Sequence, residues 1–122
     1  MLVTIQGNSR VVFVVKSYEP CRAFYERSLE LPIHREWDRG PGDRGAIYVL
    51  GTFHLELLEG DRDPTGEGIY LCVPVENVDA LWARLTGSTE VIDPIETQPW
   101  GHRNFTIRDP SGAKIKFFSP AK

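Results

Sequence analysis

The chain has 122 residues, of which 41% are hydrophobic and 25% are charged, so it suits one folded domain and is too apolar for general disorder. Its net charge is −3 and Lys and Arg form no basic stripe, which argues against nucleic acid as a partner. The two cysteines, Cys21 and Cys72, are too few for a disulfide framework and predict free thiols.

The sequence gives no sign of export or membrane insertion. The first ten residues lack a basic segment followed by a long apolar stretch, and no apolar run reaches membrane-spanning length. Together with the predicted free thiols, this pattern leads us to expect a cytoplasmic protein in a reducing compartment.

The first half of the chain predicts one helix and four strands. Val11–Val15 is β-branched and aromatic, which favours a buried strand. Ser17 or Glu19 can cap the helix that follows, and Pro20 suits its first turn. The predicted elements are a strand at 11–15, a helix at 20–29, and strands at 33–37, 46–50 and 53–58.

The second half repeats this order after a polar linker at Asp61–Gly68. Asn77 or Asp79 opens the helix, and Trp82 lies at helical spacing with Leu85, which places it in the core. The predicted elements are a strand at 69–73, a helix from 77 to 85, and strands at 89–92, 105–108 and 113–118.

Two apolar patterns recur in the two halves, in the same order. The first pattern, at an offset of 58, matches Val11, Phe13 and Val15 with Ile69, Leu71 and Val73. The second, at an offset of 60, matches Phe53, Leu55 and Leu57 with Ala113, Ile115 and Phe117. The repeat predicts an α+β fold of two βαβββ modules, about 10–60 and 68–119, forming one domain over 1–122 with an eight-stranded, cleft-bearing mixed sheet.

We expect the odd-numbered apolar positions to pack beneath the helices and the even-numbered face to line the cleft. This face combines aromatic and apolar side chains with a few charges, as small-molecule sites do, although a subunit interface would have the same composition. Its expected members are Val12, Val14, Tyr48, His54, Glu56, Leu58, Tyr70, Cys72, Lys116 and Phe118.

Three features of the chain together carry a family resemblance: the βαβββ repeat, the segment VVKSYEPCRAFYERSLEL, and the segment QPWGHRNFTIRDPSGAKIKFF. By these features the chain resembles the vicinal oxygen chelate superfamily, which includes glyoxalase I, extradiol dioxygenases and bleomycin-resistance proteins. The last segment is similar to the Pro-Trp-Gly, Arg, Phe and Asp-Pro-x-Gly stretch of bleomycin-resistance-like members. In that stretch Asp109–Gly112 is expected to form a turn.

The resemblance implies four metal-ligand positions, and most of them hold unsuitable residues here. These positions are Arg10, Glu56, Gly68 and Lys116. Of these, Glu56 alone could bind a metal, whereas a catalytic metal needs about three protein ligands. We therefore expect no metal and no other cofactor, and Glu56 pairing with Arg10 or Lys116. A set of His54, Glu56 and His102 is the less favoured alternative.

Trp100 is the residue that the resemblance singles out for ligand binding, since the matching Trp of bleomycin-resistance-like members lies beside the drug. A flat indole suits stacking on planar rings, although Trp100 could instead simply turn the chain before a strand. The full set of expected ligand-binding residues is Trp100, Tyr48, His54, Glu56, Tyr70, His102, Lys116 and Phe118. No catalytic residue is predicted.

The sequence thus favours a protein without metal that sequesters an aromatic antibiotic or metabolite. Because the chain is mildly acidic, this ligand could carry a positive charge. One alternative is an enzyme of the same superfamily, a lyase, isomerase or dioxygenase, with an atypical or absent metal site. Another is an interaction protein whose cleft is filled by its partner. We also expect a homodimer with ligand sites between subunits, because Val12, Val14, Tyr70 and Phe118 would otherwise be exposed.

Overall fold

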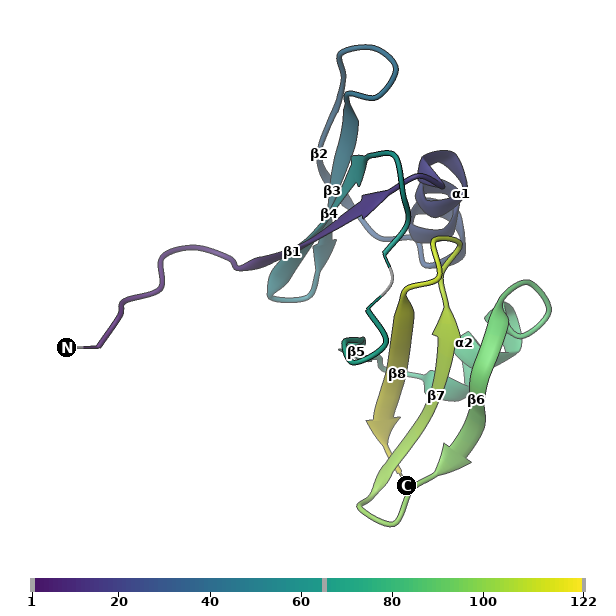
Figure 1. Ribbon diagram of the computed structural model, residues 1–122. Coiled ribbons are helices and arrows are strands. Elements are labelled where there is room, and N and C mark those ends of the chain that lie inside the picture. The colour runs from purple at the N-terminus through teal and green to yellow at the C-terminus, as the bar shows by residue number, and fades with distance from the viewer. Residues whose placement is uncertain (1, 65, 122) are drawn as a thin grey trace. The chain divides into compact units, whose positions relative to one another are not determined.

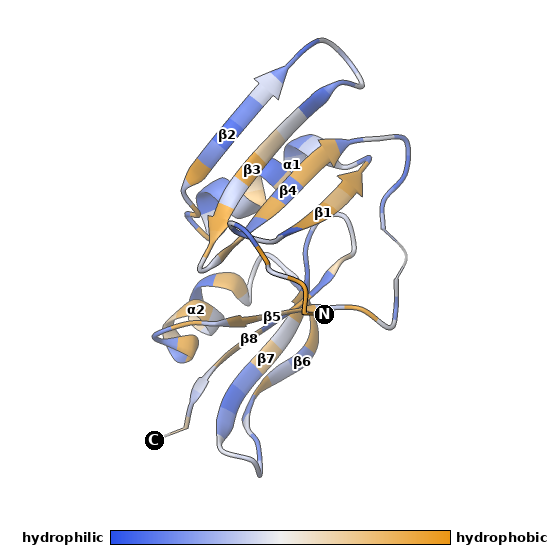
Figure 2. Ribbon diagram, turned by 90° about the vertical axis from the view of Figure 1, so that its left-hand side faces the viewer, coloured by the Kyte–Doolittle hydropathy of each residue, from blue (hydrophilic) through white to orange (hydrophobic). Residues whose placement is uncertain are grey.

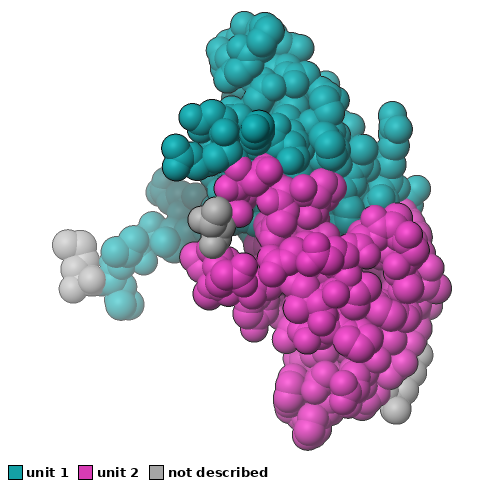
Figure 3. All heavy atoms as spheres, turned by 45° about the vertical axis from the view of Figure 1, so that its right-hand side comes forward, with its two compact units in different colours: residues 1–62 teal, residues 63–122 magenta. Residues whose placement is uncertain are grey.

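The computed structural model describes residues 2–64 and 66–121. The chain divides into two compact units, Met1–Arg62 (unit 1) and Asp63–Lys122 (unit 2), which Figure 3 shows in different colours. Each unit holds one four-stranded sheet and its own helical segment. That the two units work as a single domain stays a prediction.

Unit 1 is a mixed sheet in the order β1-β4-β3-β2 (Figure 1). The strands β1 and β4, which are first and last along the chain in this unit, run parallel to each other. The pairs β4–β3 and β3–β2 are antiparallel. The elements are β1 (Arg10–Val15), α1 (Tyr18–Ala23), a π-helical turn η1 (Phe24–Ser28), β2 (Ile33–Asp38), β3 (Arg44–Leu50) and β4 (Phe53–Glu59).

The predicted first helix is a short α-helix that widens into a π-helical turn. Ser17 is its N-cap residue, without a side-chain capping bond, and Pro20 lies in the first turn as predicted. In the π turn, the Leu29 amide donates to the Phe24 carbonyl at 3.0 Å. The wider turn lets the consecutive rings of Phe24 and Tyr25 both be buried against the sheet.

Unit 2 has the same plan, with the sheet order β5-β8-β7-β6 and a parallel pair formed by β5 and β8. The elements are β5 (Leu71–Pro74), α2 (Val78–Leu85), β6 (Glu90–Thr97), β7 (His102–Arg108) and β8 (Lys114–Pro120). β6 extends beyond the predicted strand at 89–92, because two register irregularities let it follow β7 over its full length.

Helix α2 begins where the capping residues predicted. The Asn77 side chain accepts a hydrogen bond from the Ala80 amide at 3.1 Å. The Trp82 ring packs on Phe105 of β7, with ring centroids 5.1 Å apart. Trp82 therefore belongs to the helix–sheet packing, as its spacing indicated.

Each sheet has a covered face, beneath its helix, and an open face. Leu55 and Leu57 in unit 1, and Ile115 and Phe117 in unit 2, are almost completely buried on the covered faces. The predicted packing of these odd-numbered positions is confirmed. Figure 2 shows β1 and β4 as mainly hydrophobic and the outer strand β2 as mainly hydrophilic.

The strand register corrects the sequence repeat. Val11 pairs with Leu55 in unit 1, and Leu71 pairs with Ile115 in unit 2. A single offset of 60 therefore relates β1 to β5 as well as β4 to β8, and the offset of 58 inferred for the first strands is wrong. The position equivalent to Arg10 is consequently Tyr70, two residues after Gly68.

The expected single eight-stranded sheet is also wrong. The two sheets are separate, and each hydrogen-bond ladder closes within its own βαβββ module. β1 and β2 are the edges of the first sheet, and β5 and β6 are the edges of the second. The α+β class, the two modules and the order of their elements are as predicted.

Candidate ligand-binding site

The open face of unit 1 is defined by the strand register. Val12 of β1 pairs with Glu56 of β4, Glu56 with Ile47 of β3, and Ile47 with Arg35 of β2. Paired residues point to the same side of a sheet, so these four side chains form a row across the open face. Trp37 follows Arg35 at the same-face spacing of two residues.

Glu56 is the predicted site residue with the most closely defined environment. It is 8% exposed, and its Oε1 accepts a hydrogen bond from Nη1 of Arg10 at 2.7 Å. The pairing of Glu56 with Arg10, one of the two partners expected from the sequence, is confirmed. A cation next to a buried carboxylate satisfies its charge, which burial without a partner would leave uncompensated.

Two guanidinium groups lie near the Trp37 ring. The guanidinium carbons of Arg35 and Arg39 are each 5.7 Å from the Trp37 ring centroid. The indole rests directly on Gly45 of β3, where a Cβ atom would come within 2.1 Å of the ring. Gly45 therefore provides the space that lets Trp37 lie flat across the sheet.

These residues line a pocket of about 230 Å³ in unit 1. Its lining consists of Arg10, Arg35, Trp37, Arg39, Ile47 and Glu56. Of these residues, Glu56 alone belongs to the predicted ligand-binding set, and Arg10 is one of the partners expected for it. The alternation of Arg35, Trp37 and Arg39 on one strand face was the signal that could have revealed the others, since it places an aromatic ring between two cations.

His54 lies on the open face one row away from Glu56, as predicted. Its ring stacks on His34, with centroids 4.4 Å apart and planes inclined by 24°. His54 pairs with Arg10 across the β1–β4 ladder. The open face of unit 1 thus carries an aromatic stack beside the Arg10–Glu56 pair.

Tyr48 lies on the covered face, so its assignment to the cleft-lining face is wrong. It pairs with Leu55, and its hydroxyl donates to Oε2 of Glu26 at 2.6 Å. Its ring packs near Tyr25, with centroids 5.8 Å apart. Burial, reinforced by the neighbouring Glu26 carboxylate, raises the pKa of Tyr48 above its ordinary value. The even number misled because β3 pairs an even position with an odd one in β4.

The open face of unit 2 holds four of the predicted residues in two pairs. The Lys116 ammonium lies 5.3 Å from the Tyr70 ring centroid, in a cation–π contact. His102 stacks on Phe118 with centroids 4.6 Å apart and an interplanar angle of 22°. Thr106 of β7 is the strand-register partner of Lys116. The Thr106 hydroxyl is buried and has no hydrogen-bond partner within the described residues.

Trp100 lies in the turn between β6 and β7 and is 64% exposed. The turn is closed by hydrogen bonds from the Gln98 amide to the His102 carbonyl and from the Gly101 amide to the Gln98 carbonyl. Gly101 adopts a φ of 93°, which favours glycine. The Trp100 side chain lines neither of the pockets described here.

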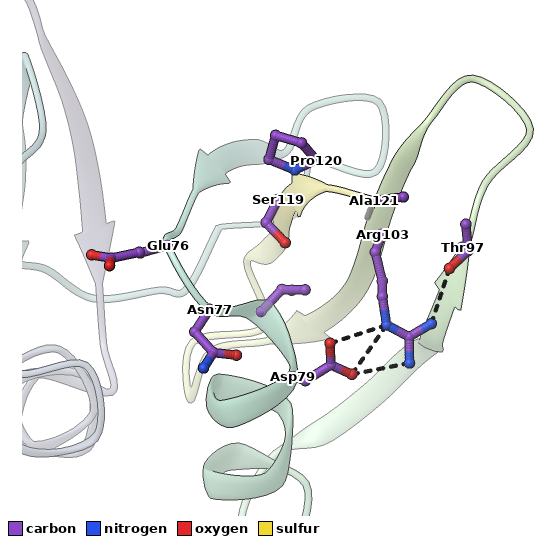
Figure 4. Close-up of a pocket in the computed structure, with 9 residues that line it drawn as sticks. Glu76, Asn77, Asp79, Thr97, Arg103, Ser119, Pro120 and Ala121 are labelled. Carbon is purple, nitrogen blue, oxygen red and sulfur yellow. Dashed lines mark hydrogen bonds and ion pairs between the residues drawn. The ribbon is translucent and has the colours of Figure 1, made fainter.

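A second pocket, of about 460 Å³, lies beside the start of α2 in unit 2 (Figure 4). Arg103 binds the Asp79 carboxylate at 3.0 Å and donates to the Thr97 hydroxyl at 3.1 Å. Arg103, Asp79 and Thr97 are therefore already paired with one another. None of the predicted ligand-binding residues lines this pocket.

The positions that the resemblance assigns to metal ligands hold residues that do not suit a metal. In unit 1 they hold the Arg10–Glu56 ion pair, and in unit 2 the register places Tyr70 and Lys116 there. Two of these four residues are cations, and Arg10 already engages the single carboxylate. Within residues 2–64 and 66–121, no three His, Cys, Asp or Glu side chains gather closely enough to hold an ion.

The cysteines and the membrane prediction are simple to place. Cys21 is buried and Cys72 is exposed, and neither forms a disulfide within the described residues. No helix in the described residues is long and apolar enough to cross a membrane. Asp109–Gly112 forms the predicted turn, in which the Asp109 carboxylate accepts hydrogen bonds from the Ser111 and Ala113 amides at 2.8 and 3.0 Å.

Several solved structures share this fold at low sequence identity. TnmS3, described as an antibiotic-binding protein from Streptomyces sp. CB03234, is 23% identical with a TM-score of 0.79, covering 98% of this chain and 100% of that one. A putative glyoxalase family protein from Bacillus anthracis is 21% identical (TM-score 0.77; 98% and 99% covered). TioX from Micromonospora sp. ML1 is 17% identical (TM-score 0.75; 94% and 99% covered).

No curated protein matches the sequence. The family profile described as "Glyoxalase/Bleomycin resistance protein/Dioxygenase superfamily" matches residues 8–117, which is most of the chain. Its match agrees with the two βαβββ modules and their parallel first and last strands. The chain belongs to the glyoxalase/bleomycin resistance protein/dioxygenase superfamily.

Proposed function

We propose that this protein binds a planar aromatic small molecule, an antibiotic or a metabolite, and sequesters it without transforming it. The observation that carries the proposal is the pocket of unit 1, where Trp37 offers an aromatic surface beside the Arg10–Glu56 pair. Small-molecule sites commonly combine an aromatic wall with a few placed polar groups. The fold-level likeness to an antibiotic-binding protein, TnmS3, supports the same reading.

The rival function, an enzyme of the superfamily, depends on a metal that polarises a substrate oxygen. The Arg10 guanidinium stands where that chemistry needs a ligand, and it neutralises Glu56. In unit 2, the Lys116 ammonium stands at the position equivalent to Glu56. No specific observation therefore favours the enzyme over the binding protein.

On the open faces, we propose that Glu56 and His54 of unit 1 and Tyr70, His102, Lys116 and Phe118 of unit 2 contribute ligand contacts. Trp100 is included because its exposed indole is available for stacking. Tyr48 is not included, because its ring is buried on the covered face.

We also propose that the protein is a homodimer. Val12 and Val14, on the edge strand β1, are 43% and 47% exposed, and Tyr70 of unit 2 is 52% exposed. Apolar side chains on an edge strand favour association with a second copy. Light scattering at micromolar concentration tests this: we expect about twice 13.8 kDa, and the mass of one chain would overturn it.

A cytoplasmic location is proposed from the cysteines. Cys72 is exposed, and neither cysteine forms a disulfide. An exposed thiol persists in a reducing compartment. Fractionation of the native host, with the protein recovered in the cytoplasmic fraction, would support the location, and recovery in another fraction would overturn it.

The decisive experiment for the binding function separates capture from turnover. The full chain is titrated with a panel of planar aromatic antibiotics by calorimetry, and each bound compound is recovered and weighed by mass spectrometry. We expect saturable binding with the compound recovered unchanged. Binding followed by a time-dependent change in mass, lost in Glu56→Gln, would establish the enzyme instead.

A further inference from the structure

We propose that the pocket of unit 1 takes a planar aromatic carboxylate, with the ring against Trp37 and the carboxylate at Arg35. This rests on the proposed binding function and adds the charge of the ligand to it. The proposed ligand is an anion, whereas the acidic composition of the chain favoured a cation. The difference arises because the residues that line the pocket are mainly positive, although the whole chain is negative.

The pocket is strongly basic. Three of its six lining residues are arginines, and one is a carboxylate, Glu56. The net charge of the whole chain is −3, but charges more than about 8–10 Å away are largely screened at physiological salt. A ligand in the pocket therefore responds to the nearby guanidinium groups rather than to the overall charge.

The three arginines differ in how far their charge is already satisfied. Arg10 donates to Glu56 at 2.7 Å, and Arg39 lies 3.3 Å from Oδ1 of Asp43. Arg35 has no carboxylate partner in the described parts of the chain, and its guanidinium contacts the Trp37 ring. Arg35 is thus the cation with an unused fork of donors.

A carboxylate matches this fork. The planar guanidinium can donate two parallel hydrogen bonds to the two oxygens of a carboxylate, which gives both affinity and orientation. A cationic ligand would instead approach three positive charges with one carboxylate, and that carboxylate is held by Arg10. The arrangement selects against a cation as well as for an anion.

The aromatic part of the ligand follows from Trp37. Its indole is half-buried and lies flat on Gly45, so the ring is held in place before a ligand arrives. The volume of about 230 Å³ is below the range of about 300–1,000 Å³ usual for drug-sized ligands. The pocket therefore suits a small aromatic acid or the acidic end of a larger molecule.

The test uses three probes that share one ring system and differ in charge: 2-naphthoate, the neutral 2-naphthamide and the cationic 2-naphthylmethylammonium. Each is titrated into the full chain by calorimetry. We expect the carboxylate to bind at least about tenfold more tightly than the amide, as a charge-assisted pair typically provides, and the ammonium to bind most weakly.

Variants assign the preference to the pocket. Arg35→Gln should bring the carboxylate-to-amide ratio close to one, mainly by weakening 2-naphthoate binding. Glu56→Gln removes the competing carboxylate and should tighten 2-naphthoate binding several-fold relative to the amide. Arg62→Gln is the matched control, since the side chain of Arg62 is 83% exposed and lies outside the pocket, and it should bind all three probes as the unchanged protein does.

The outcomes separate this inference from the function on which it rests. Equal binding of the amide, or tighter binding of the ammonium, would overturn the inference and leave the binding function standing. A carboxylate preference that survives Arg35→Gln would also overturn it. Failure of all three probes to bind at millimolar concentration would overturn the inference, while the antibiotic titration above would still decide the proposed function.

Discussion

At equivalent positions of the two sheets, unit 1 places the Arg10–Glu56 ion pair and unit 2 places the Tyr70–Lys116 cation–π contact. The covered faces, by contrast, hold buried apolar residues in both units. One scaffold therefore supports two open faces of different chemistry. The requirement to pack beneath a helix limits the covered face to apolar residues, whereas the open face is free to vary with function.

The largest expected effect tests the similarity of the covered faces. Leu55→Ala in unit 1 and Ile115→Ala in unit 2 each remove a fully buried side chain at equivalent positions. Each should lower the free energy of unfolding by about 2–5 kcal/mol, measured by chemical denaturation. Val12→Ala, on the open face, is the control and should cost far less. A similar cost for all three would contradict the division into covered and open faces.

The next effect compares two tryptophans that are proposed to contact ligand, one from each unit. Trp37→Ala in unit 1 and Trp100→Ala in unit 2 should each weaken binding of a ligand by about 1–3 kcal/mol, the usual loss for an aromatic contact. Calorimetry measures the affinity, and circular dichroism confirms that each variant is folded. An unchanged affinity in a folded Trp100→Ala variant would remove Trp100 from the site.

Much of the fold can be predicted from the sequence because strands and helices depend on local patterns of apolar residues and capping residues. The alternation in Phe53–Leu58 and Ala113–Phe118, and the cap at Asn77, correspond to the observed strands and helix. The offset of β1 was misjudged because a strand of like apolar residues matches itself equally well two residues away. The number of sheets was misjudged because edge pairing leaves no pattern in the sequence.

The site was harder to predict because it depends on register between strands. Tyr48 was assigned by its even number, although β3 pairs Tyr48 with Leu55. Trp37 and Arg35 are not predicted because β2 is mainly polar and shows no family motif. Their importance follows from Gly45, whose missing side chain lets Trp37 lie across the sheet, and that contact joins two strands.

A smaller effect compares one carboxylate from each unit at low pH. Hydrogen bonds from Arg44 lower the pKa of Glu59 in unit 1, and Lys114 does the same for Glu67 in unit 2. A carboxyl group whose pKa is lowered in the folded state stabilises the protein at pH values above its ordinary pKa of 4.5. This stabilisation is lost as the pH falls through the pKa of the folded state.

Stability should therefore decrease as the pH falls below about 4.5, measured as the denaturation midpoint at a series of pH values. Glu59→Gln and Glu67→Gln should each make this decrease shallower. Glu67 is well exposed, so its change should be the smaller of the two. A decrease of unchanged steepness in both variants would contradict the assignment of these two groups.

The last prediction is that divalent metal ions have no effect on the protein. In unit 1 the Arg10 guanidinium holds the one carboxylate at the family's ligand positions, and in unit 2 Lys116 adds a second cation. A divalent ion would have to displace Arg10 and approach an ammonium, so neither face should bind it. We expect purified protein to contain no stoichiometric zinc, nickel, manganese or iron by elemental analysis.

Adding these ions should leave the melting temperature unchanged, because an ion that does not bind the folded state cannot stabilise it. About one metal per chain, removed by a chelator with loss of stability, would show that the Arg10–Glu56 pair opens to a metal and would make the enzyme the better reading.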